Sequence, residues 1–212
     1  AGQLVRVTEP VSTHLEMTEI QTRLLAEGGP AVLFENAIRA DGTPSPMPVL
    51  VNLFGTVERV AWGMEREPAE LRELGEALAF LRQPEPPGGW REALELVPML
   101  RTALAMKPKK KSGSVPSQEV VLTGDDIDLN ALPVQMCWPG EPAPLITWPL
   151  VVTQGPNAKG KSTGDDADAR DDFNLGIYRM QVTGPNTTLM RWLKHRGGAQ
   201  HHARWKDQNR EP

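Results

Sequence analysis

The chain has 212 residues, 39% of them hydrophobic and 24% charged, and it is long enough to bury a core in one large or two small domains. Its formal net charge of −4 argues against a nucleic-acid-binding protein, which needs a basic surface to contact phosphates. The single cysteine, Cys137, excludes an intrachain disulfide and favours a reducing compartment, and no apolar run approaches the ~18 residues of a membrane span.

The amino-terminal half alternates short strands with helices, which is the start of an α/β layer. Leucines at 71, 74, 78 and 81 follow helical spacing and predict a stripe that packs into the core. The sequence Gly28-Gly29-Pro30 ends the first helix. The predicted elements are a strand over 3–7, a helix over 15–26, buried strands over 31–34 and 48–54, and helices over 69–82 and 90–106.

A polar, Lys- and Ser-rich stretch over 107–118 is the best candidate for a domain boundary, which we place near residue 115. Beyond it, residues 119–122 resemble a strand. The acidic stretch 125–128 is a solvated turn rather than a calcium loop, because it lacks the glycine and distal glutamate of an EF-hand. A strand over 146–152 is interrupted by Pro149, which predicts an edge or a bulge, and residues 154–172 predict a long acidic loop.

A β-hairpin is the centre of the second half. Residues 177–182 alternate apolar and polar side chains with a slip of one place at Met180, residues 183–186 have strong turn chemistry, and residues 187–193 are again β-rich. Such a hairpin places Arg179 and Arg191 on neighbouring strands. It leaves Asn174 and His195 just outside the two ends that lie together.

These four side chains suit a phosphate with its metal. Guanidinium groups donate forked hydrogen bonds to oxyanions, and Asn and His can bind a divalent cation through neutral atoms. The segment Arg196-Gly-Gly198 adds a loop whose backbone N–H groups can approach an anion. The adjacent His201 and His202 point in different directions from any regular backbone, so we expect them to be surface histidines.

The same residues carry a resemblance to the UbiD-type decarboxylases. The central motif is Asn174-Leu-Gly-Ile-Tyr-Arg-Met-Gln181, followed by Met190-Arg-Trp-Leu-Lys-His-Arg-Gly-Gly-Ala199. Further ordered matches cover 29–36, 49–55, 132–139 and 144–148, and so nearly the whole chain. Within the family, the chain is most similar to the members that act in ubiquinone biosynthesis. The long acidic loop over 154–172 departs from the family pattern, either as a surface insertion or as a perturbation of the metal end by Asp172.

The resemblance implies a role for each motif residue. Asn174 and His195 would bind a divalent metal, usually Mn²⁺, although His195 fits simple packing equally well. Arg179 would be catalytic, working beside an acidic proton donor. That donor and a glutamate metal ligand are expected beyond the position of Pro212, so we expect a fragment that is inactive by itself. Contacts to prenylated FMN are implied for Ile177, Tyr178, Arg179, Arg191, Trp192, Leu193, Arg196 and Gly197.

The implied fold is α+β, with an amino-terminal α/β domain over 1–115 and an incomplete split β-barrel that binds flavin over 116–212. The implied activity converts 4-hydroxy-3-polyprenylbenzoate to polyprenylphenol without oxidation. The alternatives are a non-catalytic flavin-binding module and a decarboxylase of another aromatic acid. Implied partners are the polyprenylated substrate, a flavin prenyltransferase that supplies the cofactor, and further copies of the full-length chain. The expected location is the cytoplasm, and Lys109-Lys-Lys111 allows a peripheral position on the inner face of the cell membrane.

Overall fold

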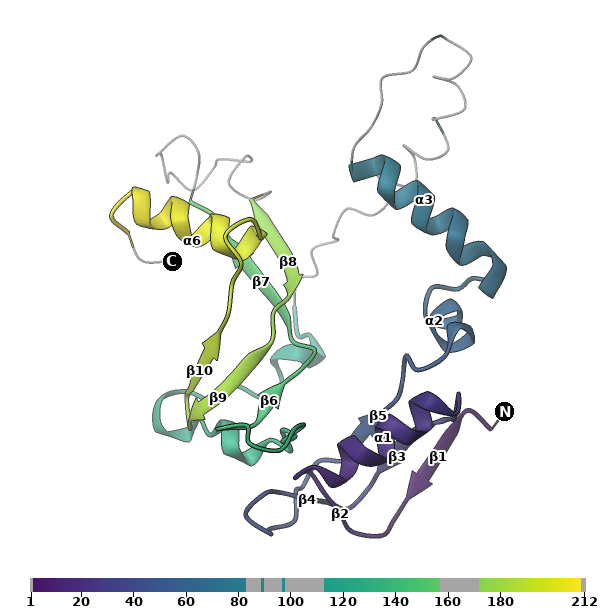
Figure 1. Cartoon of the computed structure of the whole chain (residues 1–212). Coiled ribbons are helices and arrows are strands. Elements are labelled where there is room, and N and C mark those ends of the chain that lie inside the picture. The colour runs from purple at the N-terminus through teal and green to yellow at the C-terminus, as the bar shows by residue number, and fades with distance from the viewer. Residues whose placement is uncertain (1, 83–88, 90–96, 98–112, 157–171, 211–212) are drawn as a thin grey trace.

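A computed structural model describes residues 2–82, 89, 97, 113–156 and 172–210 of the chain. Strands and helices occur in both halves, which agrees with the α+β prediction (Figure 1). The first half contains β1 (Leu4–Val7), β2 (Val11–Ser12), α1 (Glu16–Ala26), β3 (Ala31–Phe34), β4 (Ala37–Ile38), β5 (Val49–Val51), α2 (Val57–Gly63), the 3₁₀ turn η1 (Pro68–Glu70) and α3 (Leu71–Arg82).

Strand β3 is the centre of the first half. It pairs in parallel with β1 and antiparallel with β5, and α1 makes the crossover between β1 and β3. The side chains of Phe34 on β3 and Met17 on α1 are at most 1% exposed. Burying a side chain of that size contributes about 1.5–3 kcal/mol. The predicted strand over 31–34 and the helix ending at Ala26 are therefore confirmed, and they form the core of this half.

Strand β5 is shorter than predicted, because its backbone turns at Asn52. That residue has a φ of 57°, and the carbonyls of Asn52 and Leu53 accept hydrogen bonds from the guanidinium of Arg59, each at 3.0 Å. Arg59 lies on α2, a helix that the sequence analysis missed, and it also donates to the Gly29 carbonyl and the Gln3 side chain. The predicted strand over 48–54 is wrong beyond Val51 because these carbonyls serve the buried arginine.

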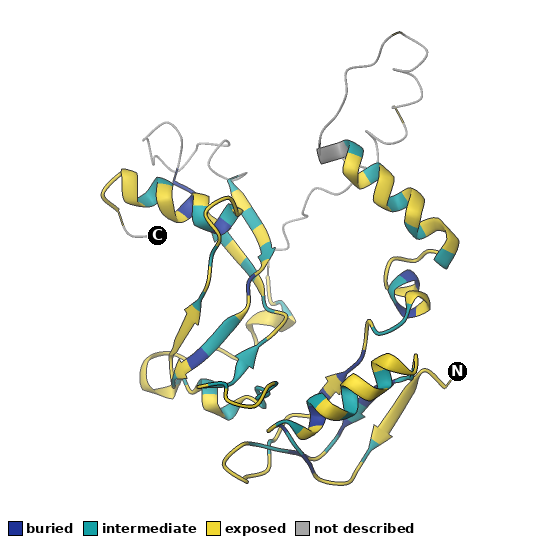
Figure 2. Ribbon diagram, in the orientation of Figure 1, coloured by how far each residue is buried: buried dark blue, intermediate teal, exposed yellow. Residues whose placement is uncertain are grey.

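The leucine stripe of α3 is not part of a core, and this prediction is wrong. None of the described side chains on α3 is buried, and Leu78 is 46% exposed (Figure 2). Helical spacing sets which residues share a face, but burial also needs a layer against which that face packs. In the described part of the chain, α3 makes its main contacts with the short turn η1.

The second half is built from short antiparallel strands. Its elements are η2 (Pro116–Gln118), η3 (Gly124–Asp126), η4 (Leu129–Ala131), β6 (Leu145–Ile146), β7 (Leu150–Gln154), β8 (Phe173–Ile177), β9 (Met180–Gly184), β10 (Thr187–Met190) and α6 (Gly197–Asp207). The acidic stretch forms the turn η3, as predicted. Residues 119–122 form no strand, contrary to prediction, because no neighbouring strand pairs with them in the described structure.

The chain changes sheet twice at one junction. One sheet has the order β10-β9-β6 and the other pairs β7 with β8. The first change, between β6 and β7, occurs at Pro149, which confirms the predicted interruption. The second separates β8 from β9 at Tyr178 and Arg179, so the predicted continuous strand over 177–182 is wrong. The alternation of apolar and polar side chains slips by one place at Met180, which is the first residue after this change of sheet. The hairpin with its turn before Thr187 is confirmed as β9–β10.

Among the described residues, one face of the β7–β8 sheet is covered by a helix. Helix α6 packs on the face that carries Thr153 and Asn174 (Figure 1). We call the other face the bare face; its five large apolar side chains are 52–68% exposed, and they are Leu150, Val152, Phe173, Leu175 and Ile177.

Backbone hydrogen bonds connect the two halves, since Met136 N–H donates to the Thr13 carbonyl and the Met136 carbonyl accepts from Leu15 N–H, both at 3.0 Å. None of the helices in the described ranges reaches the length and hydropathy that a bilayer crossing requires. Most of the predicted helix over 90–106 and most of the acidic loop over 154–172 lie outside the described residues.

Candidate functional site

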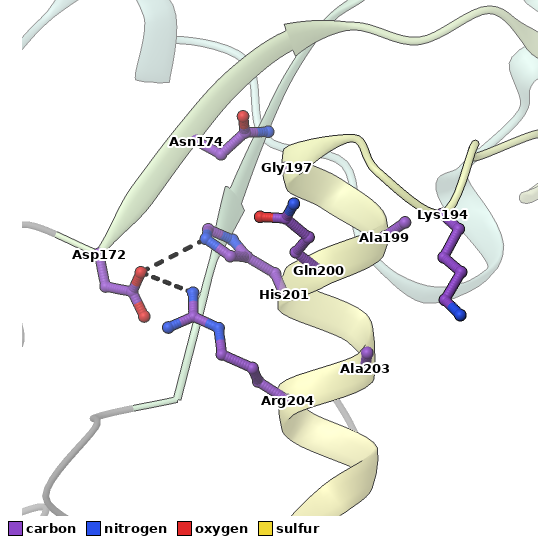
Figure 3. A pocket seen from close by; sticks show the side chains of 9 residues that line it. All are labelled: Asp172, Asn174, Lys194, Gly197, Ala199, Gln200, His201, Ala203 and Arg204. Carbon is purple, nitrogen blue, oxygen red and sulfur yellow. Dashed lines mark hydrogen bonds and ion pairs between the residues drawn. The ribbon is translucent and has the colours of Figure 1, made fainter. Parts of the chain in front are cut away.

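The candidate site lies where the amino-terminal end of α6 meets β7 and β8. A cavity of about 820 Å³ opens there, and Figure 3 shows the side chains around it. Asn174 on β8 and Thr153 on β7 are direct cross-strand partners and face the helix. The lining residues are Asp172, Asn174, Lys194, Gly197, Ala199, Gln200, His201, Ala203 and Arg204.

Asn174 is held by two hydroxyl groups. Its Nδ2 donates to Thr153 Oγ1 at 3.3 Å and to the Tyr178 hydroxyl at 3.1 Å. The same Tyr178 hydroxyl accepts from the backbone N–H of Gly198 at 2.9 Å, and the Tyr178 side chain is buried. Tyr178 therefore connects the asparagine to the first turn of α6.

The segment Arg196-Gly-Gly198 begins a helix, where the sequence predicted a loop. Arg196 is the N-cap residue and its side chain makes no capping bond. A Cβ atom at Gly197 would overlap Asn174 Oδ1, so the missing side chain is what lets the carboxamide oxygen reach the helix start. A helix amino terminus presents unpaired N–H groups and a positive dipole end, which suit an anion such as a phosphate.

A chain of polar contacts stands behind Asn174 (Figure 3). Arg204 Nη2 donates to Asp172 Oδ1 at 2.7 Å, and His201 Nε2 lies 3.4 Å from the same oxygen. His201 Nδ1 lies 3.0 Å from Thr153 Oγ1. The hydrogen bond from Arg204, together with the positive charge of its guanidinium, holds the pKa of Asp172 below its ordinary value.

His201 is buried, with 7% of its surface exposed, so the prediction of a surface histidine is wrong for this residue. It is right for His202, which is exposed. The reason is that α6 is a helix, and positions 197, 201 and 204 fall on the one face that contacts β7 and β8. The spacing of these three residues is the signal that could have located the site, had a helix been expected there.

The predicted arginines lie at a different place. Met180 pairs with Met190, so Arg179 and Arg191 sit just beyond the paired ends of β9 and β10, at the same end of the hairpin. Both are exposed, and the Arg179 guanidinium lies 5.3 Å from the centre of the Trp138 ring. Neither residue is among those that line the cavity beside Asn174.

The other predicted residues fall on three surfaces. Ile177 is on the bare face, and Leu193 and His195 are exposed in the connection between β10 and α6. The His195 ring is not among the side chains that line the cavity. Trp192 packs edge-on against Tyr178 with ring centres 5.9 Å apart, and so reaches the site through that tyrosine.

The residues of this cavity could hold a metal ion only together with further ligands, such as those of a bound phosphate. Asn174 Oδ1 is a neutral oxygen turned toward the helix start, and the described residues include no group of three or more His, Cys, Asp or Glu side chains that could hold a metal ion. The arrangement can therefore supply one ligand to a cation whose other ligands come from a bound phosphate or from elsewhere. The helix end and Lys194 offer positive potential for that phosphate.

Two family models match the chain. The model of the 3-octaprenyl-4-hydroxybenzoate carboxy-lyase N-terminal domain, UbiD_N, matches residues 1–78. The model of the 3-octaprenyl-4-hydroxybenzoate carboxy-lyase Rift-related domain, UbiD, matches residues 108–212. The candidate site lies entirely in the second match.

Solved structures share the fold at low sequence identity. The UbiD-class enzyme HmfF from Pelotomaculum thermopropionicum in complex with FMN is 22% identical with a TM-score of 0.65, and the match covers 99% of this chain and 38% of that one. The closed form of vanillic acid decarboxylase from Sedimentibacter hydroxybenzoicus is 20% identical with a TM-score of 0.69 and the same coverage. The apo form of 3,4-dihydroxybenzoic acid decarboxylase from Klebsiella pneumoniae is 19% identical, with a TM-score of 0.65 over 99% of this chain and 38% of that chain. The chain thus spans less than two fifths of the length of these structures.

Proposed function

The chain belongs to the UbiD family, and from that premise we propose that it forms the phosphate- and metal-binding part of a prenylated-FMN site in a decarboxylase. One observation carries the proposal: the carboxamide oxygen of Asn174 is turned toward the glycine-rich start of α6. A neutral oxygen ligand and a helix amino terminus side by side are what a metal-bound phosphate requires. Complexes with FMN and with prenylated FMN among the structural neighbours support the choice of cofactor.

In this proposal each residue of the site has a separate task. The N–H groups at the start of α6 bind the cofactor phosphate, and Lys194 and Arg196 add positive charge around it. Asn174 Oδ1 binds Mn²⁺ together with that phosphate. Tyr178 fixes the distance between them, because its hydroxyl bonds to both Asn174 and Gly198.

The cofactor would supply the electron sink that decarboxylation of an aromatic acid needs and that no amino-acid side chain provides. The protein's own part is to bind the substrate carboxylate and to control protons. We assign the carboxylate to Arg179, whose exposed guanidinium stands at the junction between the two sheets and can present forked donors to it. Arg191 lies at the same end of the hairpin and adds a second positive charge.

For the substrate we propose 4-hydroxy-3-polyprenylbenzoate, which fits the description of both matching family models. The neighbours named for vanillic acid and 3,4-dihydroxybenzoic acid keep another aromatic acid as the alternative. We also propose that the two small sheets belong to a split barrel and that the full-length protein is a homo-oligomer. A dimeric form among the neighbours supports the second point.

Binding of FMN and Mn²⁺ to the chain tests the site. Flavin fluorescence reports FMN, and the electron paramagnetic resonance signal of free Mn²⁺ reports the metal. Asn174→Ala should weaken Mn²⁺ binding in the presence of FMN at least tenfold, while Asn130→Ala, at an exposed asparagine outside the cavity, should leave it unchanged. Equal affinities in the two variants would refute the site.

Turnover needs a separate assay. Because the chain spans 38% of the matched structures, CO₂ release is measured with the full-length gene product and prenylated FMN. Arg179→Ala should abolish release without changing FMN affinity. Cofactor binding by the full-length protein with no release from any aromatic acid would instead identify a flavin-binding module.

A further inference from the structure

The contacts behind Asn174 form one continuous line from α6 to the strands. Arg204 contacts Asp172, Asp172 contacts His201, His201 contacts Thr153, and Thr153 contacts Asn174, at the distances given above. Two of the members, His201 and Asp172, project toward each other between the helix and the strand in Figure 3. Both line the cavity, but no hydrogen bond in the described structure joins either of them to Asn174, so an effect of theirs on that side chain has to act through Thr153.

With a neutral His201 ring, the chemistry of the members allows only one direction of donation. Asp172 faces the guanidinium of Arg204 and is a carboxylate, so it can only accept. His201 Nε2 must then carry the proton that faces Asp172, which leaves Nδ1 of the neutral ring as an acceptor. The Thr153 hydroxyl therefore donates to Nδ1, and its oxygen is left to accept from Asn174 Nδ2.

This direction of donation determines how the carboxamide of Asn174 is turned. Both hydrogens of its Nδ2 are used, one by Thr153 and one by Tyr178, so its Oδ1 faces Gly197. In the reverse orientation, Oδ1 would meet a Thr153 oxygen whose proton is already donated to His201. Two acceptors would then face each other in a partly buried site with no proton between them, which is unfavourable.

We propose that His201 is a positioning residue, which acts through Thr153 to keep the oxygen of Asn174 turned toward the start of α6. The consequence for Mn²⁺ rests on the proposed function, whereas the orientation itself does not. A residue of this kind corresponds to the outer partners of metal ligands, whose loss typically lowers metal affinity about 10–100-fold.

Nitrogen NMR of the chain with labelled histidine tests the orientation directly. The His201 ring, identified by the loss of its signals in His201→Leu, should be protonated at Nε2 and unprotonated at Nδ1. In Thr153→Val, which keeps the shape of the side chain and removes the hydroxyl, the side-chain amide signals of Asn174 should shift. Thr153→Ser keeps the hydroxyl and should leave them in place. A ring protonated at Nδ1, or amide signals that are the same in Thr153→Val and wild type, would overturn the proposal.

Mn²⁺ affinity in the presence of FMN tests the consequence. Thr153→Val and His201→Leu should bind Mn²⁺ about tenfold more weakly than wild type. Thr153→Ser should keep the wild-type affinity, and so should His201→Asn, whose Oδ1 can replace Nδ1 as the acceptor. Equal binding by Thr153→Val and Thr153→Ser would contradict the positioning role. If the wild-type chain binds neither FMN nor Mn²⁺, the proposed function fails, and the NMR spectra still decide the orientation.

Discussion

Replacing Gly197 by alanine should separate the stability of α6 from the function of its first turn. In an open helix position, alanine is more favourable than glycine by up to about 1 kcal/mol. At Gly197 the new Cβ overlaps Asn174 Oδ1, and the carboxamide has to withdraw by roughly 1 Å to restore van der Waals contact. That movement takes Nδ2 away from Thr153 and Tyr178, to which it now donates at 3.3 and 3.1 Å.

The two effects have opposite signs, and their sizes decide the outcome. Two lost hydrogen bonds are worth about 2 kcal/mol, which exceeds the helix-propensity gain. We therefore expect Gly197→Ala to lower the free energy of unfolding by about 1 kcal/mol in urea titrations, and to weaken Mn²⁺ binding with FMN at least tenfold. The same exchange at Gly75, where a Cβ meets no atom within 4 Å, should increase the helical signal in circular dichroism and leave binding unchanged. A Gly197→Ala variant that is stabilised and binds Mn²⁺ normally would refute the reasoning.

Three further predictions concern the rest of the chain. Arg59→Met leaves carbonyls without their buried donor and should lower the free energy of unfolding by about 1–3 kcal/mol, whereas Arg6→Met, at an exposed ion pair, should change it by less than 1 kcal/mol in the same urea titration. Because the neighbouring guanidinium lowers the pKa of Asp172, its carboxylate stabilises the fold above the ordinary pKa of 3.8, and this stabilisation is lost as the pH falls through the lowered value. Asp172→Asn should therefore reduce stability at pH 7 by at most about 1 kcal/mol, and unfolding titrations at decreasing pH should show the difference from wild type disappear. Leu175→Thr on the bare face should reduce the self-association of the chain in light scattering, while Val120→Thr, at an exposed valine off that face, should not; equal masses for the two variants would count against the bare face as the contact.

Local sequence signals predicted correctly those elements whose structure depends mainly on their own residues. Gly28-Gly29-Pro30 ends a helix whatever surrounds it, and an apolar run between such signals, as in β3, becomes a buried strand. Pro149 cannot donate a ladder hydrogen bond, so the interruption of its strand was also predictable. The composition of α3 predicted a helix but not its exposure, because burial depends on a partner layer that the helix itself does not encode.

The sequence predicted which residues belong to the candidate site, but not how the strands and helix bring them together. The motif identified Asn174 and the glycines at 197 and 198, but the first hairpin strand was predicted to run continuously over 177–182, through the change of sheet at Tyr178 and Arg179. That prediction placed the arginines beside the asparagine. The structure instead pairs Thr153 with Asn174 across β7 and β8. Helix α6 begins with two glycines, whose helix propensity is poor. Packing on the strands stabilises it, and that long-range contact also buries His201.

The glycines of the motif explain why its polar residues can meet at all. Asn174, Gly176 and Tyr178 alternate along one face of β8 and its end, and a Cβ at Gly176 would lie 2.5 Å from the Tyr178 ring. Without that Cβ, the ring folds back along the strand until its hydroxyl reaches both Asn174 and Gly198. At Gly198 a Cβ would lie 3.0 Å from the Trp192 ring, which packs edge-on against Tyr178. At each of these glycines, a neighbouring ring or carboxamide occupies the space that a Cβ atom would fill. This close approach of side chains to the backbone sets the distance between Asn174, the proposed cation ligand, and the start of α6.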